Sequence, residues 1–203
     1  MIKIGLDFDN TLVRYDNLFH RLAVEKGFID QSFPKNKLSI RNFFRENNIE
    51  REFTLLQGEV YGSRILEAEI ADGMFETLMN FKSKNYSMVL ISHKTKTPFL
   101  GPPYDLHKAA IDWLSEHHFF EKCGLNWNLS QVFFASTKIK KAELISQQNC
   151  SHYVDDLPEI LDLLPCEIEK ILYDPTQMHQ LSSAQSTYKK VKHWSQIHEL
   201  IVG

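Results

Sequence analysis

Short apolar runs of strand length alternate with helical patterns along most of this chain. The runs occupy residues 2–8, 87–91, 132–135, 153–154 with their flanks, and 168–173. Strands that alternate with helices pair in parallel, because each helix carries the chain back across one face of the sheet in a right-handed crossover. The alternation therefore predicts an α/β fold in which a doubly wound parallel sheet lies between two layers of helices.

The stretches between these runs have apolar residues at intervals of three and four, as on one face of a helix. We expect helices at 74–84, 105–117 and 140–148, a short helix after Pro158, and a last strand and helix within 188–203. Asp105 and Ser195 stand where a side chain can cap the first turn of a helix.

One segment, residues 15–72, breaks the alternation, because it has two or three helical patterns and no convincing strand. The apolar residues of these patterns are Leu18, Phe19 and Leu22, then Ile40, Phe43 and Phe44, then Phe53, Leu56, Val60 and Leu66. A helical insertion directly after the first strand is typical of a lid over an active site, and the alternative is a crossover that is simply long. We predict a core domain of residues 1–14 and 73–203 and a helical cap of residues 15–72.

Charge and cysteine content argue against several kinds of partner. The 23 basic and 26 acidic residues give a net charge of -3 and are mixed along the chain, so no basic stripe is available for a nucleic acid polymer. The three cysteines are widely spaced and indicate neither a zinc site nor a disulfide framework. The apolar runs fall far short of the about 20 residues that span a bilayer. We expect a cytoplasmic protein without a membrane segment, whose oligomeric state stays open.

Asp7 and Asp9 lie one residue apart at the end of the first apolar run. Ligands of open α/β sheets bind beyond the carboxyl ends of the strands, where side chains are held rigidly. Two carboxylates this close repel each other unless a cation or a proton separates them. The pair therefore indicates a metal site, an acid/base pair, or both. The plain alternative is a turn in which Asp9 and Asn10 bond their own backbone.

Further polar groups follow three other predicted strands. They are Ser92 and His93, then the lysine cluster Lys138, Lys140 and Lys141, then Asp155 and Asp156. Each group by itself is explained by a turn, a helix cap or a solvated surface. Because parallel strands present their carboxyl ends at one edge of the sheet, we expect all of these groups to converge there with Asp7 and Asp9.

Four strings of this sequence resemble, in order, the four motifs of the haloacid dehalogenase (HAD) superfamily of phosphohydrolases. They are D-F-D-N-T-L at 7–12, I-S at 91–92, the lysine, and V-D-D at 154–156. The longer string H-Y-V-D-D-L-P-E-I-L is similar to the fourth motif of many uncharacterised members. The resemblance covers essentially the whole chain and implies a Rossmann-like core. It also places the helical insertion at the C1 cap position of that superfamily.

The resemblance implies a role for each residue of the first motifs. Asp7 would be the nucleophile that forms an aspartyl-phosphate. Asp9 would protonate the leaving oxygen and then deprotonate the attacking water, and its backbone carbonyl would bind the metal. Thr11 would fix the loop, and Ser92, with His93 beside it, would bind the phosphoryl group of the substrate.

The implied metal is Mg²⁺, which prefers oxygen ligands, and Asp7 and Asp156 would ligate it with Asp155 in support. Which of Asp155 and Asp156 ligates directly stays open, because the later acid of the superfamily is replaced here by Ile160. The lysine that neutralises Asp7 and the phosphoryl group is either Lys141, which opens a helical run and matches the pattern best, or Lys138 in the preceding loop.

Asp9 separates the reactions known within the superfamily. Members that cleave carbon–halogen bonds lack this second acid, because they have no alkoxide to protonate. We therefore expect a Mg²⁺-dependent phosphomonoester hydrolase acting on a small phosphorylated metabolite, such as a sugar phosphate or a nucleotide. The alternatives are a phosphotransferase or phosphomutase, and a catalytically silent small-molecule binding protein. A phosphorylatable receiver domain is disfavoured, because its acidic pair comes early and its lysine last.

Overall fold

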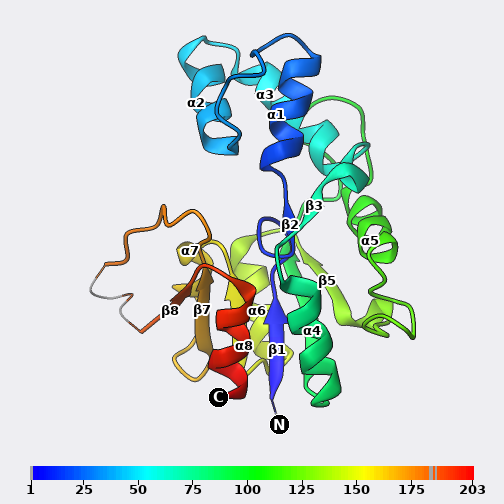
Figure 1. The fold of residues 1–203 in the computed structure, drawn as a ribbon, viewed down its shortest axis with the longest axis vertical. Helices are drawn as coiled ribbons and strands as arrows, with labels where there is room; N and C mark the ends of the chain where they lie inside the picture. Colours follow the sequence, from blue (N-terminus) through cyan, green and yellow to red (C-terminus); the bar gives the residue numbers. More distant parts are fainter. Residues whose placement is uncertain (1, 183–184, 186) are drawn as a thin grey trace. The chain divides into compact units, whose positions relative to one another are not determined.

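The computed structural model describes residues 2–182, 185 and 187–203, which divide into two compact units (Figure 1). The first unit comprises the described residues within 1–13, 70–94 and 118–203. The second comprises residues 14–69 and 95–117. The chain passes between the units within β2 (Val13–Arg14) and β3 (Glu69–Ile70), which form a two-stranded sheet, and again after Lys94 and after His117.

The first unit is built on a six-stranded sheet with the order β5-β4-β1-β6-β7-β8, in which every neighbouring pair is parallel. Its strands are β1 (Lys3–Leu6), β4 (Ser87–His93), β5 (Val132–Ala135), β6 (His152–Asp155), β7 (Glu169–Tyr173) and β8 (Lys189–Val191). The predicted parallel α/β sheet is confirmed. The first strand is shorter than expected, because the carbonyl of Phe8 accepts the N–H groups of Leu12 at 3.0 Å and Val13 at 3.2 Å and so closes a turn.

Helices cover both faces of this sheet (Figure 1). On one face α4 (Met74–Ser83) packs against α8 (Trp194–Val202). On the other face α6 (Lys138–Gln147) and α7 (Pro158–Leu161) pack against the strands and each other, and the short helix η2 (Leu129–Gln131) precedes β5. Buried strand residues therefore alternate between two apolar layers, as the period of a strand requires. The three-layer arrangement is the predicted one.

Gly5 and Tyr153 fix the packing directly beneath the ends of β1 and β6. The two residues are paired across these strands. A Cβ atom on Gly5 would lie 2.5 Å from Cδ2 of Tyr153, so only glycine leaves room for this ring. The Tyr153 hydroxyl donates a 2.5 Å hydrogen bond to the carbonyl of Ile91 on β4. The ring thus links β6 to β4 beneath β1.

The second unit consists of α1 (Asp16–Glu25), α2 (Lys37–Glu46), α3 (Glu50–Tyr61), η1 (Ile65–Glu67) and α5 (Leu106–Glu116). Its core is aromatic, with Phe53 of α3 packed against Phe19 of α1 and Phe44 of α2. Helix α5 packs against η1 and α3, and the buried Nε1 of Trp113 donates to the carbonyl of Ala68 at 3.0 Å. These contacts group residues 95–117 with the helical insertion, whereas the predicted boundaries left them in the core domain.

Several local expectations are confirmed and others are wrong. Asp105 caps α5 as predicted and accepts from the N–H of Lys108 at 2.9 Å. Ser195 does not cap the last helix, because α8 begins one residue earlier and Gln196 Oε1 accepts the N–H of His193 at 3.2 Å. Leu66 lies beyond α3 and is 52% exposed, so it does not belong to the core of the insertion. Among the described residues, no helix is both long and apolar enough to cross a membrane.

Candidate active site

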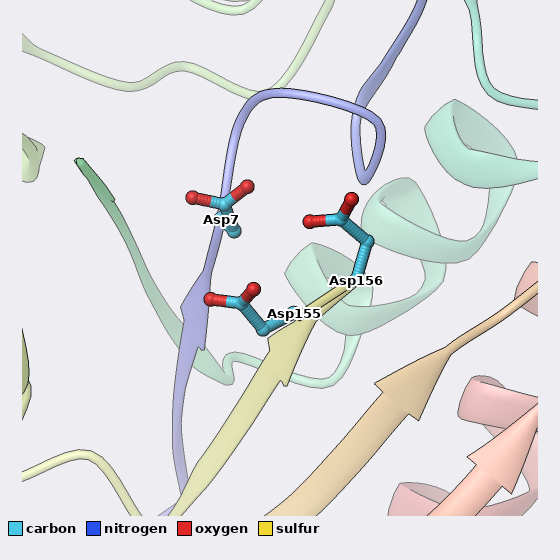
Figure 2. A group of neighbouring side chains, drawn as sticks. All are labelled: Asp7, Asp155 and Asp156. Atoms are coloured by element: carbon cyan, nitrogen blue, oxygen red, sulfur yellow. The ribbon is translucent and has the colours of Figure 1, made fainter. Parts of the chain in front are cut away.

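Three carboxylates gather where β1 and β6 end (Figure 2). Asp7 follows β1, Asp155 is the last residue of β6, and Asp156 follows it. Each offers an oxygen atom, and these atoms lie within 4.8 Å of one another. Asp7 and Asp155 are buried, whereas Asp156 is partly buried. The predicted convergence of these acids at one edge of the sheet is therefore present in the structure.

The register of the sheet produces this cluster. Leu6 of β1 pairs with Val154 of β6, and the N–H of Asp7 donates to the carbonyl of Val154 at 2.9 Å. Because these two parallel strands are paired residue by residue, they end next to each other, and the side chains that follow them lie side by side. The chain then turns away after each strand, which keeps the carboxylates at the edge.

Lys141 supplies a buried cation to the cluster. Its Nζ lies 2.5 Å from Oδ1 of Asp7 and 2.6 Å from Oδ2 of Asp155, and 5.6 Å above the ring of Tyr153. Lys138 instead pairs with Glu159, and both of those side chains are largely exposed. Lys138 also lies inside α6 and not in a loop, because Thr137 caps that helix by accepting from the N–H of Lys140. Of the two candidate lysines, Lys141 is the one that contacts Asp7.

Asp9 has a buried cation of its own. The Nζ of Lys94 lies 2.9 Å from both carboxylate oxygens of Asp9. The Lys94 side chain is 3% exposed, whereas that of Asp9 is 26% exposed. Lys94 follows β4 directly, two residues after Ser92. Asp7 and Asp9 are thus neutralised by two different lysines, one in α6 and one directly after β4.

Two of the predicted hydroxyl groups are buried and lack a hydrogen-bond partner among the described residues. They belong to Thr11 and Ser92, which are 0% and 1% exposed. The backbone of Thr11 is held in place, because its carbonyl accepts from Nε1 of Trp194 at 3.3 Å. A buried hydroxyl without a partner is costly unless a ligand completes it. His93, also predicted to bind substrate, is the exposed last residue of β4.

Burial and mutual repulsion shift the titration of the carboxylates. Burial raises the pKa of Asp7 from 3.8 to about 7; Lys141 opposes this rise, and the charges of Asp155 and Asp9 add to it. Burial, together with Asp155 and Asp7, raises the pKa of Asp156 well above its ordinary range. Burial alone would lower the pKa of Lys141, but the attraction of Asp155 and Asp7 outweighs it and raises that pKa. When these carboxyl groups are ionised, their negative charge therefore exceeds what the lysines neutralise.

This excess of charge fits a divalent cation. With all groups ionised, Asp7, Asp9, Asp155 and Asp156 carry four negative charges against the two positive charges of Lys94 and Lys141. A dication would balance the remainder, and oxygen-only ligands suit Mg²⁺. Both oxygens of Asp155 are already engaged, one by Lys141 and the other by the N–H of Leu157 at 2.9 Å. Among the residues that the structure describes, Asp156 accepts a single, longer bond of 3.3 Å from Nδ2 of Asn10.

Sequence reasoning missed three residues of this site, which are Asn10, Lys94 and Tyr153. Asn10 adopts a left-handed conformation with φ 57°, and its side chain reaches Asp156. Asparagine tolerates this conformation better than most residues, so its place after Asp9 was an available signal. Nothing local in the sequence connects Lys94 to Asp9, because the pair is 85 residues apart.

Known proteins resemble this chain in sequence and in fold. No family model matches the chain. A protein of Oceanobacillus iheyensis named "Putative nucleotidase OB0422" is 24% identical over 177 residues, which cover 85% of this chain and 86% of that protein. A solved structure of a predicted phosphatase from Clostridium acetobutylicum is similar with a TM-score of 0.60 and 15% identity, over 99% of this chain and 98% of the other. The "putative HAD-hydrolase YfnB" of Bacillus subtilis, solved bound to magnesium, gives a TM-score of 0.55 and 10% identity over 100% of this chain and 99% of the other.

This chain has the HAD fold. The Rossmann-like core implied by the sequence resemblance is confirmed, and the likeness to the solved structures extends over nearly the full length of the chain. The carboxylates described above lie at the carboxyl ends of the central strands, which is where open α/β sheets bind their ligands. At identities this low the likeness concerns the fold, so the chemistry must be argued from the residues of this chain.

Proposed function

We propose that this protein is a Mg²⁺-dependent phosphomonoester hydrolase that acts through an aspartyl-phosphate. The observation that carries the proposal is the buried lysine, Lys141, whose Nζ contacts both Asp7 and Asp155 at the end of the central strands. Phosphoryl transfer needs a positioned nucleophile and positive charge around the phosphoryl oxygens. This arrangement supplies both. An ordinary turn or a solvated surface would require neither a positioned carboxylate nor a buried lysine.

Asp7 is the nucleophile in this proposal. Its carboxylate attacks the phosphorus atom, the bond from phosphorus to the leaving oxygen breaks, and the phosphoryl group passes to Asp7. Lys141 neutralises the charge that accumulates on the phosphoryl oxygens. The buried hydroxyls of Thr11 and Ser92 then have a role that explains their lack of partners, because a phosphoryl oxygen can accept from each.

Asp9 moves the proton. Its side chain is partly exposed, so it can reach the oxygen of the leaving group. It protonates that oxygen as the ester bond breaks and takes a proton from the water that hydrolyses the aspartyl-phosphate. Its protonation is thereby restored after each turnover.

Asp7 and Asp156 are the residues that would hold Mg²⁺, with the backbone carbonyl of Asp9 as a further ligand. Asp155 would support the site by holding Lys141, since both of its oxygens have protein partners. When bound, the cation offsets the negative charge that the cluster and the phosphoryl group share. The solved structure of YfnB with magnesium supports this choice of metal.

The substrate would be a small phosphorylated metabolite. The name of the Oceanobacillus iheyensis relative favours a nucleotide over a sugar phosphate. In this proposal the helical insertion of residues 15–72 acts as the cap that selects the leaving group, and residues 95–117 belong to the same compact unit. The reaction is consistent with a cytoplasmic protein.

The test is hydrolysis of an aryl phosphate, with Mg²⁺ and with a chelator, by the wild type and by Asp7→Asn. The variant keeps the size of the side chain, so loss of activity with an unchanged thermal transition supports the nucleophile. Lys140→Met is the matched control, because Lys140 is an exposed neighbour of Lys141 on α6. Acid-quenched wild type should contain phosphate on Asp7, identified by mass spectrometry. Retained hydrolysis by Asp7→Asn would refute the mechanism.

Two other outcomes are distinguishable in the same assay. A phosphotransferase would form phosphorylated product when acceptor alcohols are added and little free phosphate. A catalytically silent binding protein would bind phosphate esters and turn over none of them with Mg²⁺ present.

A further inference from the structure

Lys94 forms a second buried ion pair in the site, separate from the pair made by Lys141. Its Nζ is 2.9 Å from each oxygen of the Asp9 carboxylate, which places it astride that group. A cation held against both oxygens restricts rotation of the carboxyl group. Asp9 is therefore fixed in orientation as well as in position.

The backbone and the stem of Lys94 are also anchored. The N–H of Lys94 donates to the carbonyl of Ala135 at 3.1 Å, which continues the pairing of β4 with β5. The Nζ lies 5.4 Å from the centre of the Phe8 ring, and the side chain is 3% exposed. By contrast, the surface pair of Lys108 and Asp112 has side chains that are 72% and 44% exposed. Both ends of Lys94 are thus held, the backbone by β5 and the ammonium group by Asp9 and the Phe8 ring.

We propose that Lys94 is a positioning residue that orients the Asp9 carboxyl group toward the leaving oxygen. The proposal rests on the proposed hydrolase function. In the proton balance, the proton that reaches the leaving oxygen comes from Asp9, and the proton that Asp9 regains comes from water. Lys94 keeps its own protons throughout and touches neither the phosphorus nor the leaving group. Its effect on the reaction therefore passes entirely through Asp9.

The dependence on the leaving group tests this role. A proton donor matters for a poor leaving group, such as phenolate, and matters little for 2,4-dinitrophenolate, which departs without a proton. We would measure kcat/KM for a series from phenyl phosphate to 2,4-dinitrophenyl phosphate, because kcat/KM reports the steps up to transfer of the phosphoryl group. The variants are Lys94→Met, Asp9→Asn and the double variant. Methionine is of similar length and carries no charge, so it removes the contacts of Nζ with Asp9 and with the Phe8 ring. Lys140→Met is the surface control.

For Lys94→Met we expect kcat/KM to fall by about 10- to 100-fold with phenyl phosphate, since a positioned acid contributes about 10²- to 10⁴-fold. The fall with 2,4-dinitrophenyl phosphate should be less than about threefold, on the same physical ground. Asp9→Asn should show the same pattern with a larger amplitude. Adding Lys94→Met to Asp9→Asn should cost little more, because residues that act through one another are not additive.

Three results would overturn the role. An equal loss for every leaving group would make Lys94 a structural residue. A loss that persists in the Asp9→Asn background, with weaker inhibition by inorganic phosphate, would make it a phosphate-binding residue. Unchanged kcat/KM throughout would make it dispensable. If the wild type hydrolyses no phosphate ester at all, the proposed function fails, and the role of Lys94 fails with it. If the wild type is active and the variants give one of the three results above, only the role of Lys94 fails.

Discussion

Two ion networks in this chain lie in opposite environments. In the first unit, Lys141 joins Asp7 and Asp155, and the three side chains are 2%, 5% and 0% exposed. In the second unit, Arg64 joins Glu25 and Glu67, and these side chains are 33%, 44% and 37% exposed. Both networks pair one basic side chain with two carboxylates, but they differ in their exposure to solvent.

The difference shows where the chain accepts a cost in stability. Taking charges out of water is expensive, and a buried pair offsets that cost only with good geometry and further hydrogen bonds. The surface network avoids the cost and contributes little. A buried network with an excess of negative charge, at the ends of the central strands, is hard to explain as a device for stability. The proposed function explains it by the metal ion and the phosphoryl group that the network would bind.

The largest effect is expected when Lys141 is replaced by methionine. Loss of a group that stabilises charge in the transition state lowers kcat by about 10³-fold, the upper range for a single such donor. Lys138→Met removes only the surface pair with Glu159, so its kcat should stay close to that of the wild type. Steady-state kinetics on an aryl phosphate compares the two. A larger loss for Lys138→Met than for Lys141→Met would show that the static contacts misidentify the lysine.

The next effect concerns the two adjacent acids where β6 ends, Asp155 and Asp156. We expect Asp156→Asn to weaken Mg²⁺ binding by about 100-fold and Asp155→Asn by about 10-fold, the span over which supporting groups alter metal affinity. The reason is that both oxygens of Asp155 have protein partners, whereas Asp156 accepts from Asn10 alone within the described part of the chain. Titration calorimetry with Mg²⁺ measures both. The reverse order of affinities would assign the direct ligand to Asp155.

The pH dependence of Mg²⁺ binding is a third test of the buried network. The folded pKa of Asp7, about 7, lies above its ordinary value of 3.8, so the metal-free fold favours the protonated acid. Asp7 therefore lowers the stability of the metal-free protein as pH rises from about 4 to about 7, with no further change above.

A metal ion that binds the ionised carboxylate competes with this proton. Its apparent affinity should rise by about tenfold per pH unit for each proton displaced, up to about pH 7. Thermal unfolding with and without Mg²⁺ at pH 5.5 and pH 8 provides the measurement, and the stabilisation by the metal should be larger at pH 8. The same titration of Asp7→Asn should have a weaker pH dependence. Equal stabilisation at both pH values would contradict the raised pKa.

Most of the fold was predictable because its signals are local. The run at 132–135 is β5 with the same bounds, and Asp105 caps α5 as expected. The acids at the strand ends were also predictable, since parallel strands share one edge. What the sequence could not provide were contacts between distant segments. The pairing of Lys94 with Asp9 and the bond from Trp113 to Ala68 connect residues far apart in the chain. No periodicity encodes either one.

The smallest effect is expected in the surface network, and it completes the comparison. Arg64→Gln removes the pairs with Glu25 and Glu67, yet exposed pairs contribute at most about 1 kcal/mol to the free energy of unfolding. The loss should shrink further at about 1 M salt, where screening acts within about 3 Å. Urea unfolding at low and high salt measures it, with hydrolysis of an aryl phosphate as the second readout. A loss of several kcal/mol that salt does not reduce would show that solvent exposure does not predict how much the Arg64 ion pairs contribute to stability. The contrast with Lys141 would then fail.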